Sequence, residues 1–168
     1  MFIGKPAPDF RMTTTKDLNT LAHEATLKDY RGKWLVLFFY PADFTFICPT
    51  EVLAFNAAAP AFAGLDAELL GVSTDGIHSH VAWMEFHIGK LDFPLASDRS
   101  QAVSRAYDVL DNEGQSARAV FIIDPDGIVR YEVIHDDSVG RSVEEVLRVL
   151  TAVQAPGRTF AQFAAVSC

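Results

Sequence analysis

Long apolar runs along the chain alternate with segments whose apolar residues recur at helical spacing. Residues 34–42 form a continuous apolar run after a polar turn that contains Gly32, which is typical of a β-strand buried on both faces. Residues 67–75 and 93–98 predict two further short strands. Residues 117–135 predict a hairpin, because "DPDG" is a turn sequence between two β-rich runs.

Four other segments have the apolar spacing of amphipathic helices. They cover residues 50–62, 77–88, 101–110 and 142–154. Ser142 is followed three residues later by Glu145, and this spacing predicts a capping box at the start of the last helix.

The order of these segments predicts an α/β fold, in which a mixed central sheet carries helices on both faces. The succession of strand, helix, strand, hairpin and helix resembles the thioredoxin fold. We expect one domain over residues 1–155. Residues 156–168 begin with a Pro-Gly pair and have little pattern, so we expect a C-terminal tail, which ends in Cys168.

Composition and charge narrow the classes of partner. The chain has 168 residues, of which 49% are apolar and 21% charged, a balance typical of a globular domain. The formal net charge of −8 weighs against nucleic acid or an anionic membrane surface as the main partner. The longest apolar run, residues 34–42, is about half of the roughly 20 residues that a membrane span needs.

Cysteine usage and the N-terminus indicate the compartment. Two cysteines in 168 residues do not make a disulfide scaffold. The start, "MFIGKPAPDF", has no long apolar segment and no small-residue cleavage site, so we expect no signal peptide. A cytoplasmic protein is the resulting expectation.

Cys48 lies where a loop meets a predicted helix, within "FFYPADFTFICPTE". Pro49 suits the first turn of a helix, where its missing N–H costs nothing. The unpaired N–H groups and the positive end of a helix dipole stabilise a thiolate. Thr45 is three residues upstream, so its hydroxyl could stand beside the sulfur, and Pro41 stiffens the loop. The alternative to a reactive Cys48 is an inert cysteine that packs in the core, which is the more common role of a buried cysteine.

The spacing P-x-x-x-T-x-x-C of Pro41, Thr45 and Cys48, followed by "PTE", resembles the active-site signature of the peroxiredoxins. The stretch is similar to the two-cysteine branch that includes the alkyl hydroperoxide reductase C proteins. Further segments resemble the family in the family's order, so that the resemblance covers most of the chain. They are "GKPAPDF", "LLGVSTD", "HVAW", "FPLASD", "FIIDPDGIVR" and "GRSVEEVLRVL".

The resemblance implies a thiol-dependent peroxidase that reduces hydrogen peroxide and alkyl hydroperoxides. Cys48 would be the peroxidatic cysteine that becomes a sulfenic acid, and Arg118 would reach its sulfur. Arg141 and Glu51 would support the site, with Glu51 paired to one of the two arginines. Taken alone, Arg118 is an ordinary arginine at a strand entry, and Glu51 is a favourable charge in a helix's first turn.

The resemblance also makes Cys168 the resolving cysteine, acting on the partner subunit of a homodimer. The family usually has Val-Cys-Pro at this point, whereas this chain reads "AVSC". The alternative to a resolving role is that Cys168 is an exposed terminal thiol without a function. We expect thioredoxin or a flavoprotein disulfide reductase as the reductant, and a dimer or a ring of dimers such as a decamer.

No cofactor or metal is expected. The five histidines have no zinc-like spacing to a cysteine or carboxylate, and the chain has no C-x-x-C, P-loop or G-x-G-x-x-G.

Two other functions stay open. One is a one-cysteine peroxidase in which Cys168 is idle. The other is an oligomeric holdase or redox-relay scaffold, for which the aromatic loop Phe44–Phe46 and the helix of Trp83 could supply an interface.

Overall fold

The computed structural model describes residues 1–155. The strands are β1 (Arg11–Thr14), β2 (Glu24–Thr26), β3 (Trp34–Phe39), β4 (Ala67–Ser73), β5 (Leu95–Ser97), β6 (Arg118–Ile123) and β7 (Val129–His135). The α-helices are α1 (Cys48–Gly64), α2 (Ile77–Trp83), α3 (Ala102–Ala106) and α4 (Val143–Gln154). The 3-10 helix η1 (Leu27–Tyr30) precedes β3, and the π-helix η2 (Met84–Ile88) continues α2.

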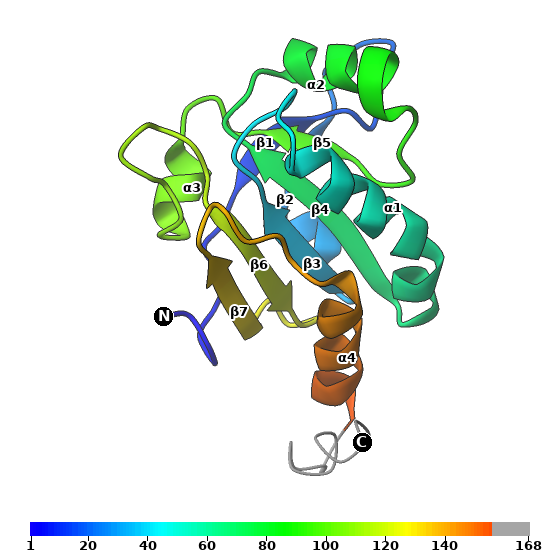
Figure 1. Cartoon of the computed structure of the whole chain (residues 1–168). Coiled ribbons are helices and arrows are strands. Elements are labelled where there is room, and N and C mark those ends of the chain that lie inside the picture. The colour runs from blue at the N-terminus through cyan, green and yellow to red at the C-terminus, as the bar shows by residue number, and fades with distance from the viewer. Residues whose placement is uncertain (156–168) are drawn as a thin grey trace.

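Seven strands form a mixed sheet in the order β2-β1-β5-β4-β3-β6-β7 (Figure 1). β4 is parallel to both β3 and β5, and the remaining neighbours are antiparallel. The apolar run that forms β3 lies inside the sheet, between β4 and β6, and is buried on both faces. The prediction of a mixed sheet with helices on both faces is therefore confirmed.

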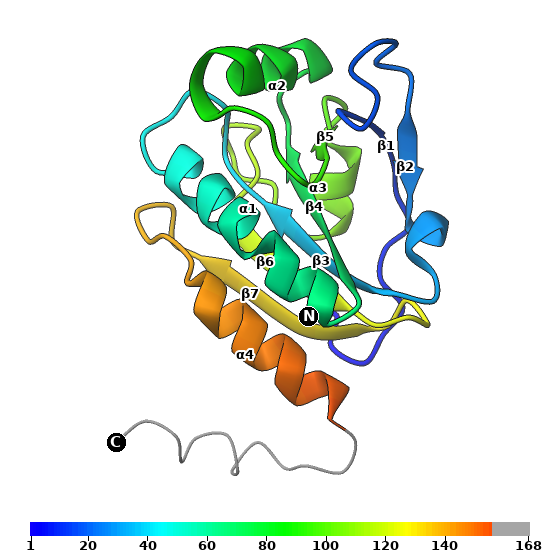
Figure 2. The same ribbon diagram turned by 90° about the vertical axis from the view of Figure 1, so that its right-hand side faces the viewer.

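Side chains of β3 alternate between two apolar cores, one on each face of the sheet. Val36 and Phe38 pack in the core that α1 and α4 cover. Leu35, Leu37 and Phe39 pack in the second core, with α3 and the N-terminal segment. Figure 2 shows α1 and α4 next to each other on one face and α3 behind the sheet.

Most differences from the sequence predictions concern short or irregular elements. The sequence predicts no element in the first 27 residues, but β1 and β2 lie there. Strands of three or four residues contain too few positions for a periodic signal. The predicted helix over residues 101–110 shrinks to α3, which follows Gln101 in the left-handed region (φ 61°). The first helix begins earlier than predicted, at Cys48.

The capping box predicted for the last helix forms only in part. Ser142 Oγ accepts a hydrogen bond from the Glu145 backbone N–H at 3.2 Å. The Glu145 carboxylate instead accepts two hydrogen bonds from Arg148, one turn further along α4.

The topology brings three distant segments to one end of the sheet. β3 ends there and leads through the β3–α1 loop (residues 40–47) into α1. β6 begins there, because it runs antiparallel to β3 with Phe39 opposite Ala119. The loop between β7 and α4 lies at the same end as the first turn of α1 (Figure 2). The N-terminus of α1 therefore faces residues far away in the sequence.

Candidate active site around Cys48

Cys48 is the first residue of α1, and it is a fully buried free thiol. Pro49 follows it in the first turn, as the sequence indicates, and no side chain caps this end of the helix. The helix therefore presents its positive end next to a thiol that is shielded from water. A negative charge at this position would be stabilised by the helix dipole.

Arg118, the first residue of β6, reaches the sulfur. Its Nη1 lies 3.3 Å from Cys48 Sγ and also donates to Glu51 Oε2 at 2.6 Å. Its Nε donates to the backbone carbonyl of Asp137 at 2.7 Å, so both ends of the guanidinium are held. Burial would lower the pKa of Arg118, but hydrogen bonding and charge from Cys48 and Glu51 outweigh burial and raise it.

Glu51 joins the two arginines that the sequence singled out. Its Oε1 accepts from the backbone N–H and from Nε of Arg141 at 2.8 and 2.9 Å, and its Oε2 accepts from Arg141 Nη2 at 3.1 Å. Burial would raise the pKa of Glu51, but the hydrogen bonds and charge of Arg141, together with the charge of Arg118, lower it overall. Glu51 was expected to pair with one arginine, and it contacts both.

Arg141 also ties the surrounding elements together. Its Nη1 donates to the backbone carbonyls of Phe39 and Ala119, at 2.5 and 2.8 Å, and thereby links the ends of β3 and β6. Its guanidinium carbon lies 5.7 Å from the ring centroid of Phe38 and 5.9 Å from that of Phe55. These contacts fix the residue that positions Glu51.

The charges of this cluster do not cancel. Arg118 and Arg141 supply two positive charges, and Glu51 supplies one negative charge. The Asp137 carboxylate lies 3.5 Å from Arg118 Nε but is 79% exposed, so water screens it. A Cys48 thiolate would supply the missing buried negative charge next to Arg118.

The β3–α1 loop contains Pro41 and Thr45, and these two residues differ in their exposure to solvent. Pro41 is buried, whereas Thr45 is exposed. Thr45 Oγ1 donates to the Ala42 carbonyl at 3.1 Å, so the structure does not bring this hydroxyl to the sulfur as the sequence suggested. The preceding Phe44 has a φ of 57°, an uncommon backbone conformation for a bulky residue. Cys168 lies outside residues 1–155.

Sequence reasoning missed a buried polar group at the base of this loop. Asp43 and His80 are both buried, and Asp43 Oδ2 lies 2.8 Å from His80 Nδ1. The Tyr40 hydroxyl donates to Asp43 Oδ1 at 2.8 Å. A signal was available in the helix pattern, since His80 lies three residues after Ile77 and four before Met84, on the apolar face.

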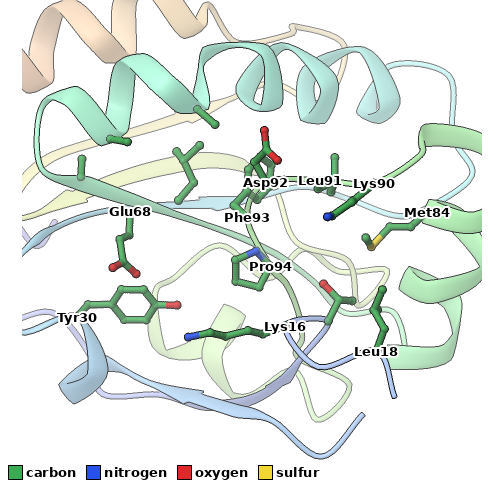
Figure 3. Close-up of a pocket in the computed structure, with 15 residues that line it drawn as sticks. Lys16, Leu18, Tyr30, Glu68, Met84, Lys90, Leu91, Asp92, Phe93 and Pro94 are labelled. Carbon is green, nitrogen blue, oxygen red and sulfur yellow. The ribbon is translucent and has the colours of Figure 1, made fainter. Parts of the chain in front are cut away.

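A cavity of about 440 Å³ lies away from this cluster, beside the C-terminal half of α1 (Figure 3). Its walls include Leu69 and Phe93, and the ring of Tyr30 points into it. Burial raises the pKa of Tyr30. None of the four residues of the charged cluster lines this cavity. Within residues 1–155, no group of three or more His, Cys, Asp or Glu is arranged to hold a metal ion.

Comparisons with known proteins agree on one family. The model of the AhpC/TSA family matches residues 3–132. A Clostridium pasteurianum protein described as a peroxiredoxin in the rubredoxin operon is 52% identical over 92% of this chain and 90% of its own. The mitochondrial thioredoxin-dependent peroxide reductase of Drosophila melanogaster is 49% identical, with 90% of this chain and 67% of that protein covered.

A solved structure extends the similarity to the fold. The reduced 2-Cys peroxiredoxin of Plasmodium vivax matches with a TM-score of 0.88 and 37% identity. The match covers 92% of this chain and 82% of that one. The fold is thioredoxin-like, as the order of predicted elements indicated.

Proposed function

Because this chain belongs to the AhpC/TSA family and is a peroxiredoxin, we propose that it reduces hydrogen peroxide and alkyl hydroperoxides at Cys48. The observation that carries this proposal is the contact of Arg118 Nη1 with Cys48 Sγ, at 3.3 Å. It lies in a buried cluster that has one uncompensated positive charge. A thiolate completes the charge balance of the cluster, and only the thiolate is a strong nucleophile.

In the proposed step, the Cys48 thiolate attacks the terminal oxygen of the hydroperoxide. An S–O bond forms while the O–O bond breaks, and the departing alkoxide or hydroxide takes up a proton to leave as alcohol or water. Arg118 donates hydrogen bonds to the oxygens as negative charge moves onto the leaving group. Arg141 and Glu51 hold Arg118 in place, since Glu51 contacts both guanidinium groups.

Thr45 and Pro41 complete the proposed site. The Thr45 hydroxyl turns from the Ala42 carbonyl, which it contacts at 3.1 Å, towards a substrate oxygen. This turn needs only a rotation of the exposed Thr45 side chain and the loss of that one hydrogen bond. Pro41 is buried at the end of β3 and brings no N–H donor into the site.

We propose that Cys168 of the partner subunit resolves the Cys48 sulfenic acid. Its thiol attacks the sulfenic sulfur, a disulfide forms and water leaves. Cys48 is 0% exposed, so the first turn of α1 must open before another sulfur can approach within the roughly 2 Å of an S–S bond. The name of the Drosophila relative supports thioredoxin as the dithiol reductant. A flavoprotein disulfide reductase would carry out the same exchange.

The proposed assembly is a homodimer or a ring of dimers such as a decamer. Its support is the exposure of aromatic side chains in the β3–α1 loop and in η2, of which Phe46 is 99% and Phe86 71% exposed. The two segments meet where the Phe44 ring lies 4.8 Å from that of His87 in η2. The helix of Trp83 was expected to contribute, but Trp83 itself is fully buried, and the exposed residue is Phe86. The same surface supports the alternative of a holdase or redox-relay scaffold.

The proposed compartment is the cytoplasm. Between residues 1 and 155, no helix is long and apolar enough to cross a membrane.

Intact mass under non-reducing conditions tests the mechanism, after one equivalent of hydrogen peroxide and a rapid quench. We expect loss of two hydrogens per cysteine pair and a Cys48–Cys168 bond that joins two chains. In Cys168→Ser, we expect one added oxygen on Cys48 and no cross-link. Thioredoxin-dependent turnover that survives Cys168→Ser would establish the one-cysteine alternative. An unreactive Cys48 in the unmodified chain would contradict the peroxidase function itself.

A further inference from the structure

The buried Asp43–His80 pair anchors the loop that leads into Cys48. His80 in α2 is fully buried, and the Asp43 side chain is 1% exposed. Asp43 lies in the β3–α1 loop, two residues before Thr45 and five before Cys48. The proposed peroxidase chemistry does not use either residue of this pair.

Both ring nitrogens of His80 face groups that accept hydrogen bonds. Nδ1 lies 2.8 Å from Asp43 Oδ2, and Nε2 lies 3.2 Å from the Ala96 carbonyl in β5. A carbonyl oxygen cannot donate, and Asp43 Oδ2 also accepts from Ser79 Oγ at 2.7 Å. Both ring nitrogens of His80 are therefore held by partners from two different segments, and the ring cannot turn without breaking one of these contacts.

Asp43 is fixed from several elements at once. The Tyr40 hydroxyl donates to Asp43 Oδ1 at 2.8 Å and lies 3.4 Å from His80 Nδ1. Burial and the charge of Asp43 hold the pKa of Tyr40 well above its usual value, so this hydroxyl keeps its proton. The Asp43 backbone N–H donates to Asp75 Oδ2 at 2.9 Å, which ties the loop to the end of β4.

The anchored loop is otherwise weakly held. Phe44 has positive φ, and the side chains of Phe44, Thr45 and Phe46 are exposed. A bulky residue in the left-handed region costs free energy that its surroundings must offset. The Asp43 carboxylate and backbone N–H are both bonded inside the protein, to Tyr40 of the same loop, to Asp75 after β4, and to Ser79 and His80 of α2.

We infer that the Asp43–His80 pair is a positioning device that holds the β3–α1 loop closed and keeps Cys48 buried against Arg118. This inference rests on the proposed peroxidase function for its catalytic consequence. A closed loop favours attack on peroxide, whereas disulfide formation needs the loop and the first turn of α1 to open. The pair therefore sets how long a sulfenic acid stays in the closed site, exposed to a second peroxide.

The device depends on the imidazole ring. Within residues 1–155, the titratable groups in contact with His80 are Asp43 and Tyr40, and the Asp43 backbone links the pair to Asp75. Removing the ring would leave the buried Asp43 carboxyl without its partner at 2.8 Å, so it is expected to loosen the loop.

Hydrogen exchange of the backbone amides, measured on the reduced full chain, tests whether the pair holds the loop and needs no peroxide. The variants are His80→Asn, which keeps an amide donor near the Nδ1 position but lacks the ring, and Asp43→Asn. His78→Asn is the matched control, because His78 is exposed on the same helix. In both test variants, we expect the amides of residue 43 and of Glu51 to exchange at least tenfold faster. The Val146 amide, bonded within α4, should stay within twofold of the unmodified chain.

The double variant separates a specific pair from general packing. The two substitutions together should accelerate exchange no more than the stronger one alone, because the second removes an interaction already lost.

The catalytic consequence is measured with one and with excess hydrogen peroxide. Both test variants should react more slowly at Cys48 and form a smaller share of sulfinic acid than the unmodified chain, with His78→Asn unchanged. Loop exchange within twofold of the unmodified chain would overturn the inference. An unreactive Cys48 in the unmodified chain would instead contradict the peroxidase function, and the exchange experiment would still judge the pair.

Discussion

Replacing Glu51 with Gln should cost much of the protein's stability. The Glu51 carboxylate accepts four hydrogen bonds, one from Arg118 and three from Arg141, and it is the buried negative charge between two buried guanidinium groups. The amide NH₂ of Gln would face N–H donors and would remove the buried negative charge that both guanidinium groups share. Breaking a buried ion pair in this way costs about 3–5 kcal/mol, a large share of a typical total of about 5–15 kcal/mol.

The assay is urea unfolding of the reduced chain at one fixed protein concentration, since assembly also contributes to apparent stability. With a slope of about 2 kcal/mol/M, the midpoint should fall by roughly 1.5–2.5 M. Glu145→Gln is the matched control. Glu145 also accepts two hydrogen bonds from one arginine, at 2.7 and 2.8 Å, but that pair is about half-exposed. Glu145→Gln should lower the urea midpoint several-fold less than Glu51→Gln does, because water already screens the Glu145–Arg148 pair.

The same substitution should change the response to acid. The pKa of Glu51 is lower in the folded chain than its usual value of about 4.3. Its contribution to stability is therefore complete above that value, and it is lost as the pH falls through the lower folded pKa. Glu51→Gln should show a weaker loss of stability in this acidic window. Equal midpoints for Glu51→Gln and Glu145→Gln, or an unchanged acid profile, would refute the assignment of Glu51 as the ionised centre of the cluster.

Two further substitutions test the proposed chemistry. Arg118→Lys should slow the reaction of Cys48 with hydrogen peroxide by about tenfold or more in stopped flow, because one ammonium cannot reproduce the fixed guanidinium that contacts Cys48, Glu51 and the Asp137 carbonyl. A rate near that of the unmodified chain would exclude a role for this contact. Thr45→Val should slow the same step by about tenfold, and Thr45→Ser should restore most of the rate. If valine and serine behave alike, the hydroxyl does not touch the substrate.

Local sequence patterns were sufficient for the central strands, the longer helices and the family. β3, β4 and the β6–β7 hairpin are apolar segments bounded by turn residues, and such signals depend only on neighbours along the chain. The loop and helix start around Cys48 follow from a motif of fixed spacing. The short strands β1 and β2 and the length of α3 did not follow, because tertiary pairing and not local periodicity decides whether such short segments form.

In the charged cluster, too, the sequence identified the residues but the tertiary structure decided their contacts. The sequence marked Cys48, Arg118, Glu51 and Arg141 separately, but nothing in their spacing required Glu51 to contact both arginines. Glu51 and Arg141 are 90 positions apart, and their contact exists because β6 and the start of α4 meet the N-terminus of α1. The excess of one positive charge affects Cys48 only because the fold brings these groups together in a buried site.

The sequence by itself determined the central strands, the longer helices and the family, and it predicted Cys48 as the reactive cysteine, because hydrophobic periodicity and a contiguous motif are properties of neighbouring residues. Only the tertiary structure decided that Thr45 points to the Ala42 carbonyl and that Asp43 pairs with His80, 37 positions away. The physical reason is that the energy of a polar group depends on which partners surround it after water has been removed. Those partners come from segments that only the folded sheet brings together.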